Sequence, residues 1–246
     1  MLKNVELIPF ASPQHLAQAA ASRLLKLIAE QSRAGRSLSL ALSGGRIAAT
    51  FFDAVVEEAR SRPVDWTRVL FFWSDERCVP PTDSASNFLL TWHHLLEPLG
   101  IQPKSIHRLK GELDTAIAAI AAAEDLTRSI ERRSGEIPVL DLILLGLGED
   151  GHVASLFPSE NETARADARL FRSVVASKPP PARITMGYPL LAAASEVWIL
   201  ASGQGKEAAL AGALRADGKS PCAQLLRNRL KTAIFTDIAS AVPSTE

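Results

Sequence analysis

The chain has 246 residues, with 27 basic and 27 acidic side chains, so its formal net charge is zero. A neutral chain lacks the broad positive field that non-specific nucleic-acid binding uses, and we expect no nucleic-acid partner. Apolar residues make up 47% of the sequence, which is enough for a buried core. No apolar run approaches the roughly 20 residues that a membrane-spanning helix needs, so we expect no membrane partner.

The cysteine usage and the N-terminal segment both indicate an ordinary reduced protein. Cys78 and Cys222 lie far apart and form no Cys-x-x-Cys motif, so neither a disulfide framework nor a zinc site is predicted. The residues after Met1 lead directly into a strand-like run, without the apolar core of a signal peptide. We therefore expect a cytoplasmic globular protein, either a monomer or a weak homodimer.

Strand-like and helix-like segments alternate along the chain. Short apolar runs predict strands at 5–10, 38–42, 69–73, 140–145, 172–176, 184–186, 197–200 and 232–235. A first helix should begin with Ser12 as N-cap and Pro13 at its first position. Further helices are predicted from residue 46 to about residue 60 and over 204–215. A long helix before the strand at 140–145 is marked by Leu113, Ile117, Ile120 and Ile130.

This alternation predicts an α/β fold, with a mostly parallel sheet and helices on both faces. The chain contains no repeat and no low-complexity segment, and its Pro-rich turn at 178–181 is short. We therefore expect residues 1–246 to form a single domain.

Three polar segments directly follow predicted strands, at 43–46, 74–77 and 146–152. Because ligands of open α/β sheets bind outside the carboxyl ends of the strands, these segments predict one functional face. In the first segment, the backbone N–H groups of Ser43, Gly44 and Gly45 lie before a helix and suit a phosphate group. The alternative for such a short motif is a tight turn without a ligand.

Two glycine motifs resemble nucleotide-binding loops but lack the required context. Gly146-x-Gly148-x-x-Gly151 follows a strand, but Pro158 limits any helix after it, and the strand at 172–176 is not followed by an acidic residue. The segment that ends in Lys206 lacks the first glycine and the final Ser or Thr of a P-loop. We expect no nucleotide cofactor. Lys206 at the start of a helix is still well placed to meet a phosphate, although it could equally be a solvated surface lysine.

His152 is the strongest candidate for acid/base chemistry. It follows Asp150 by two positions in a glycine-rich loop at a strand end, and histidine exchanges protons near neutral pH. A single loop histidine can also be structural or merely exposed, which is how we interpret the other four. His93 and His94 are adjacent and would point about 100° apart on a helix, so no metal site is predicted.

In order along the chain, these motifs resemble the 6-phosphogluconolactonase family. The matching segments are Leu42-Ser43-Gly44-Gly45, Asp75-Glu76-Arg77 with Ser86-Asn87, Gly146-x-Gly148-x-Asp150-Gly151-His152-x-x-Ser155-Leu156-Phe157-Pro158, Arg183-Ile184-Thr185 and Gly203-x-x-Lys206. The resemblance runs from residue 42 to about residue 235, and the segment 146–158 is its most specific part.

The resemblance implies a Rossmann-like α/β domain related to the glucosamine-6-phosphate deaminase fold. It also implies hydrolysis of 6-phospho-D-glucono-1,5-lactone, the second step of the oxidative pentose phosphate pathway, without metal or cofactor. The position of His152 would carry the general base, oriented by Asp150, with Arg77 or a loop N–H facing the oxyanion. The residues expected to bind substrate are Ser43, Gly44, Gly45, Arg46, Asp75, Arg77, Arg183 and Lys206.

Two alternatives share these motifs. Amino-sugar-phosphate deaminases of the same fold carry Asp-Glu-Tyr and Phe-Asn-Glu-Pro motifs, where this chain has Arg77 and the segment 155–158 without an acid. A non-catalytic sugar-phosphate sensor would normally carry a DNA-binding helical module, and none fits before residue 38 or after residue 235. One departure from the lactonase pattern is Arg46-Ile47-Ala48, where the family usually has two hydroxyl residues and a proline.

Overall fold

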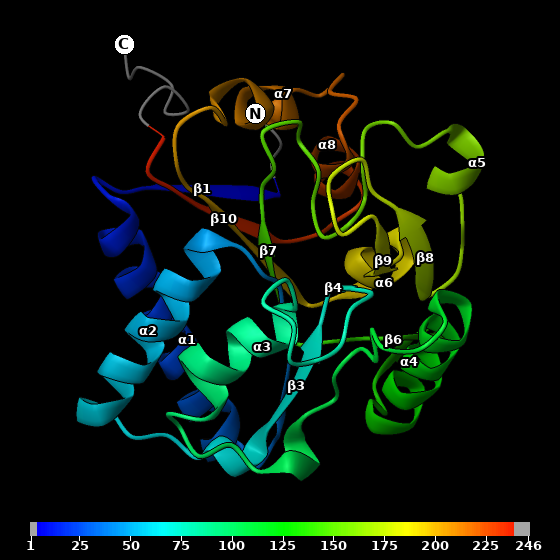
Figure 1. Ribbon diagram of the computed structural model, residues 1–246. Helices are drawn as coiled ribbons and strands as arrows, with labels where there is room; N and C mark the ends of the chain where they lie inside the picture. The colour runs from blue at the N-terminus through cyan, green and yellow to red at the C-terminus, as the bar shows by residue number, and fades with distance from the viewer. Residues whose placement is uncertain (1–3, 239–246) are drawn as a thin grey trace.

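The computed structural model describes residues 4–238, which are organised around a parallel sheet of six strands (Figure 1). In spatial order the strands are β1 (Val5–Pro9), β11 (Thr232–Thr236), β10 (Glu196–Ala201), β7 (Leu142–Gly146), β2 (Leu38–Leu42) and β3 (Val69–Trp73). Every residue of β2 and β11 is buried, as expected for strands that are covered on both faces.

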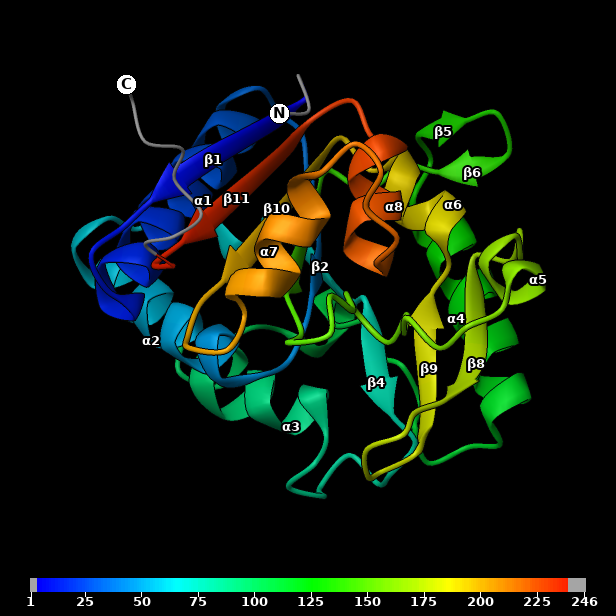
Figure 2. The same ribbon diagram turned by 90° about the horizontal axis from the view of Figure 1, so that it is seen from above.

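Helices cover both faces of this sheet. On one side lie α1 (Pro13–Arg33) and α2 (Arg46–Ser61), and on the other lie α7 (Glu207–Leu214) and α8 (Pro221–Arg227) (Figure 2). Helix α1 begins as expected, because the Ser12 hydroxyl accepts a hydrogen bond from the His15 N–H at 3.2 Å and Pro13 takes the first position. The predicted α/β fold class is confirmed.

A second, antiparallel sheet of three strands lies beside the first. Its order is β4 (Asp75–Arg77), β9 (Ala182–Met186) and β8 (Phe171–Val175), and α4 (Thr115–Ser129) packs against it. The strands predicted at 172–176 and 184–186 therefore exist, but outside the parallel sheet. The remaining elements are short: α3 (Asn87–Thr91), the π-helical turn Trp92–Leu96, α5 (Glu162–Arg165), α6 (Tyr188–Ala193), the 3-10 turns Trp66–Arg68 and Pro103–Ser105, and the hairpin β5 (Arg133–Ser134) with β6 (Ile137–Pro138).

The predicted long helix is α4, but not all of the apolar residues that marked it face the core. Ile117 and Ile120 are 59% and 62% exposed, whereas the helix buries Ala118, Ala119 and Leu126. Small alanines let α4 lie close to the antiparallel sheet, and a periodic pattern of large apolar residues cannot reveal that choice.

Two further expectations concerned the cysteines and membrane-spanning helices. Cys78 and Cys222 are both free, and burial raises the pKa of the Cys222 thiol to about 12. No helix within residues 4–238 has the length and apolar character to cross a bilayer.

The order of the strands places a ligand crevice between β2 and β7. From β2 the chain continues to β3 on one side, whereas β7 pairs with β2 on its other side. Such a reversal separates the loops that follow the two strands and opens a crevice at their carboxyl ends. The segments that follow β2 and β7 begin with Ser43 and Leu147, so two of the three predicted polar segments flank this crevice.

Buried Arg229 fixes the end of α6 near the sheet. Its guanidinium donates to the carbonyl oxygens of Leu191, Ala192 and Ala194 at 2.5, 3.0 and 2.9 Å, and it also bonds the Lys231 carbonyl and the Thr232 hydroxyl. Burial lowers its pKa to about 10, so the side chain is still a cation at neutral pH. These bonds satisfy carbonyl groups that the end of a helix leaves without a partner.

We expect Arg229→Ala to lower the free energy of unfolding by at least about 2 kcal/mol, because several buried carbonyls would lose their donors. Urea unfolding followed by circular dichroism measures the change. Arg128→Ala is the matched control: its side chain is 69% exposed and its ion pairs are long, so the change should stay within about 0.5 kcal/mol. Equal stabilities of the two variants would contradict the structural role of Arg229.

Candidate active site

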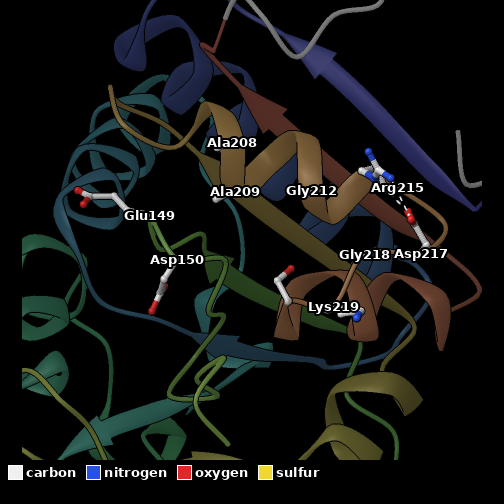
Figure 3. Close-up of a pocket in the computed structure, with 10 residues that line it drawn as sticks. Glu149, Asp150, Ala208, Ala209, Gly212, Arg215, Asp217, Gly218 and Lys219 are labelled. Atoms are coloured by element: carbon white, nitrogen blue, oxygen red, sulfur yellow. Dashed lines mark hydrogen bonds and ion pairs between the residues drawn. The ribbon is translucent and has the colours of Figure 1, made fainter.

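A cleft of about 830 Å³ lies at the carboxyl ends of β2 and β7. It is lined by most of the site residues predicted from the sequence: Ser43, Gly44, Gly45, Arg46, Asp75, Arg77, His152 and Lys206. Two others do not line it. Asp150 lines a second hollow of about 440 Å³ beside α7 and α8 (Figure 3), and Arg183 is buried.

A buried carboxylate, that of Asp75, joins the three walls of the cleft. Its side chain accepts hydrogen bonds from the Ser155 hydroxyl at 2.7 Å and from the Ser43 hydroxyl at 3.3 Å. Its backbone carbonyl accepts one from the Asn87 amide at 3.0 Å. Asp75 is only 5% exposed, so these donors hold the end of β2, the start of α3 and the 146–155 loop around it.

The glycine turn after β2 allows a close backbone approach. A Cβ atom at Gly44 would lie 1.9 Å from the Asn87 side-chain oxygen, so only glycine fits there. Gly45 is the N-cap of α2 with a φ of 105°, a conformation that favours glycine, and Arg46 is the first residue of the helix. The backbone thus presents the N-terminus of a 16-residue helix to the cleft, where an anion is favoured.

Glu76 does not line the cleft, but it holds the start of α3, which contributes Asn87 to the cleft. Its carboxylate accepts the backbone N–H groups of Arg77, Asn87 and Phe88, each at 2.7 Å, and the Ser86 hydroxyl at 3.0 Å. Burial raises the pKa of Glu76, and the four donors oppose that rise. The carboxylate therefore fixes the start of α3, which carries Asn87 to Asp75.

Two arginines face each other across neighbouring strands of the small sheet. Arg77 on β4 is paired in register with Arg183 on β9. The Arg77 guanidinium donates to the Ala85 carbonyl at 2.6 Å, and the Arg183 guanidinium donates to the Pro180 carbonyl at 2.6 Å. Burial, together with the charge of Arg77, lowers the pKa of Arg183. Backbone carbonyls thus accept a hydrogen bond from each of these two neighbouring cations, although Arg77 Nε is buried without a partner among residues 4–238. Of the two arginines, only Arg77 lines the cleft.

His152 and Asp150 form a short side-chain pair. The imidazole Nδ1 lies 2.5 Å from Asp150 Oδ1, and the same oxygen accepts the His152 backbone N–H at 3.1 Å. Burial opposes ionisation of Asp150, but the hydrogen bonds from His152 outweigh it and lower the pKa of the carboxyl group. Because Asp150 occupies Nδ1, Nε2 remains as the nitrogen that can accept a proton from water.

Glycine at position 148 makes room for this imidazole. A Cβ at Gly148 would lie 2.0 Å from His152 Nδ1, and the ring of Phe157 packs on the imidazole with its centroid 5.1 Å away. Asp150 and Phe157 therefore orient the imidazole from two sides. Because the side chain is still 31% exposed, it remains accessible to water.

Lys206 and Arg46 form a cationic end of the cleft. Lys206 is the N-cap residue of α7. Burial lowers the pKa of Lys206, and the charge of Arg46 lowers it further, while Glu149 and Asp237 act in the opposite direction. Two cations that repel each other next to a helix N-terminus are arranged to receive an anion with more than one negative charge.

The further residues that line the cleft include Asn87, Glu149 and Lys178. From the sequence, Asn87 and Glu149 were recognised only as members of motifs, and Lys178 only as part of a proline-rich turn. Their positions depend on contacts between distant segments, such as that of Asn87 with Gly44, which a motif does not describe. No group of three or more His, Cys, Asp or Glu residues within 4–238 is arranged to hold a metal ion.

A parallel sheet with a glycine turn, a cationic end and a histidine–aspartate pair at one crevice defines an α/β protein suited to phosphorylated small molecules. The model of the family described as glucosamine-6-phosphate isomerases/6-phosphogluconolactonase matches residues 11–234. The chain belongs to this family, as its motifs indicated.

The relatives are consistent in fold and in name. A 6-phosphogluconolactonase of Treponema pallidum is 39% identical over 197 residues, covering 79% of this chain and 80% of that protein. One of Streptomyces coelicolor is 35% identical over 250 residues, covering 98% and 95%. The solved structure of the 6-phosphogluconolactonase from Trypanosoma cruzi superposes with a TM-score of 0.85 at 26% identity, covering 98% of both chains.

Proposed function

We propose that this chain hydrolyses 6-phospho-D-glucono-1,5-lactone to 6-phospho-D-gluconate, the second step of the oxidative pentose phosphate pathway. The pairing of His152 with Asp150 beside a cationic cleft carries this proposal, because lactone hydrolysis needs an activated water near an anchored phosphate. The names of the relatives support the substrate. We propose further that residues 1–246 act as one cytoplasmic domain, a monomer or weak homodimer, without metal or cofactor.

In the proposed mechanism, His152 acts as general base. Its Nε2 takes a proton from a water molecule while the water oxygen bonds to C1 of the lactone, which gives a tetrahedral oxyanion. The bond between C1 and the ring oxygen then breaks, and the proton passes from His152 to that ring oxygen. Asp150 orients the imidazole and stabilises its cation between the two steps. Arg77 or a backbone N–H of the 146–151 loop faces the oxyanion.

Amino-sugar-phosphate deaminases have the same fold, and deamination is therefore the main alternative function. The segment Ser155-Leu156-Phe157-Pro158 offers no acidic group, and Ser155 is engaged with Asp75. The direct test compares lactone loss above spontaneous hydrolysis with ammonia release from glucosamine 6-phosphate. Ammonia release without lactone hydrolysis would overturn the proposal.

We expect His152→Ala to lower kcat at least about 100-fold with little change in KM, because only help in the transition state is lost. Stopped-assay kinetics on the phosphorylated lactone measure both constants. His93→Ala is the control, since that exposed histidine lies outside the cleft. Gly148→Ala keeps the imidazole but displaces it, so it should also lower kcat. Near-normal turnover of folded His152→Ala would refute the mechanism.

Turnover should survive dialysis against a strong chelator and need no added nucleotide, because acid/base catalysis and positioning suffice for an electrophilic lactone. The rate before and after dialysis is the measurement. Loss of activity that a divalent ion restores would show that a metal takes part.

Arg46 is proposed to bind the substrate phosphate together with Lys206. We expect Arg46→Ala to raise KM about tenfold and leave kcat almost unchanged, because a remote contact with the phosphate is equally strong in the ground and transition states. Arg36→Ala, an exposed arginine away from the cleft, is the control. An unchanged KM in Arg46→Ala would mean that this arginine makes no phosphate contact.

A further inference from the structure

The loop 177–181 between β8 and β9 brings a lysine to the cleft that the proposed mechanism does not use. Lys178 lines the cleft together with Arg77 and His152. Its side chain is exposed and makes no ion pair with any residue between 4 and 238. An unpaired ammonium group at the wall of a binding cleft is available to an anionic ligand.

Arg183 contacts the backbone of this loop at two carbonyl groups. Its Nε donates to the Pro180 carbonyl at 2.6 Å, and its Nη2 lies 3.4 Å from the Lys178 carbonyl. Arg183 is 7% exposed and does not line the cleft. A rigid planar guanidinium that bridges two carbonyls fixes the path of the backbone, and therefore the position from which the Lys178 side chain extends.

The loop 146–155, which carries His152, contacts the elements that bring Lys206 to the cleft at one end and those that bring Arg77 to it at the other. At one end, Glu149 packs on the turn that leads to Lys206, since a Cβ at Gly205 would lie 3.8 Å from its carboxyl carbon. At the other end, Ser155 bonds Asp75 and its N–H bonds Thr185, on strands β4 and β9. His152 lies in the sequence between these two contacts, Glu149 and Ser155.

We propose that Lys178 contacts the C1 end of the substrate, where it stabilises the oxyanion and then the product carboxylate, and that Arg183 is the positioning residue for Lys178. This inference rests on the proposed function. If the phosphate lies at Arg46 and Lys206, and C1 lies at His152, the group beyond C1 meets Arg77 and Lys178. Apart from the charge that the phosphate already carries, the only negative charge that develops in the reaction is at C1.

Two ligands that differ only at C1 test this assignment. 6-Phosphogluconate carries a carboxylate there, whereas glucitol 6-phosphate carries an uncharged hydroxymethyl group. Isothermal titration calorimetry should show that Lys178→Met weakens binding of 6-phosphogluconate about tenfold, the loss of one charge-assisted contact, and changes binding of glucitol 6-phosphate less than about twofold. Lys178→Arg, which keeps the charge, should retain most of the preference for the carboxylate.

Kinetics give an independent readout. Because the lactone has no charge at C1, Lys178→Met should lower kcat about tenfold with little change in KM, the opposite of the pattern expected for Arg46→Ala. Lys104→Met is the matched control, an exposed lysine on the 3-10 turn Pro103–Ser105 that should change neither ligand affinity nor kcat.

Equal losses for the two ligands in Lys178→Met would overturn the proposal and place Lys178 at the phosphate, and no loss for either would make it a bystander. Arg183→Lys should reduce the carboxylate preference while the circular dichroism spectrum stays unchanged; a folded variant with full preference would refute the positioning role. The proposed function fails separately, if the unmodified protein shows no lactone hydrolysis.

Discussion

The arrangement of the site depends on the buried carboxylate of Asp75. It is the first residue of β4, in the antiparallel sheet, yet its oxygens accept hydrogen bonds from Ser43 at the end of β2 and from Ser155 in the loop after β7. A buried carboxylate strongly favours such donors, because without them its desolvation would be costly. Satisfying Asp75 therefore brings the two sheets together, and the cleft forms where they meet.

The fold was largely predictable because its signals are local. Continuous apolar runs marked the parallel strands, and Ser12 with Pro13 marked the start of α1. The antiparallel sheet was not recognised, since β4 is only three residues long and its partner strands look the same as parallel ones in sequence. The helix α4 was recognised, but not the face that it buries: alanines and Leu126 make the contact, and Ile117 and Ile120 face solvent.

The sequence motifs predicted which residues belong to the site. They did not predict which contacts those residues make. Eight of the ten predicted side chains or backbone segments line one cleft, since strand ends of a parallel sheet meet at one edge. Motif and resemblance grouped Arg183 with the substrate, whereas its guanidinium is directed at the carbonyls of the 177–181 loop. Lys178 had no motif, because its position depends on that non-local contact.

The electrostatics of the cleft follow from a chain without net charge. With no overall field to attract an anion, binding must depend on a few cations close to the ligand, and these are effective only where water is partly excluded. Such placement has a cost, visible in the pKa values of Lys206 and Arg183, which burial and a neighbouring arginine both lower. The protein tolerates this because helix α2 and backbone carbonyls hold the charged groups in place. Cations from several elements therefore line the same cleft as His152, where they are placed to orient an anionic ligand by charge.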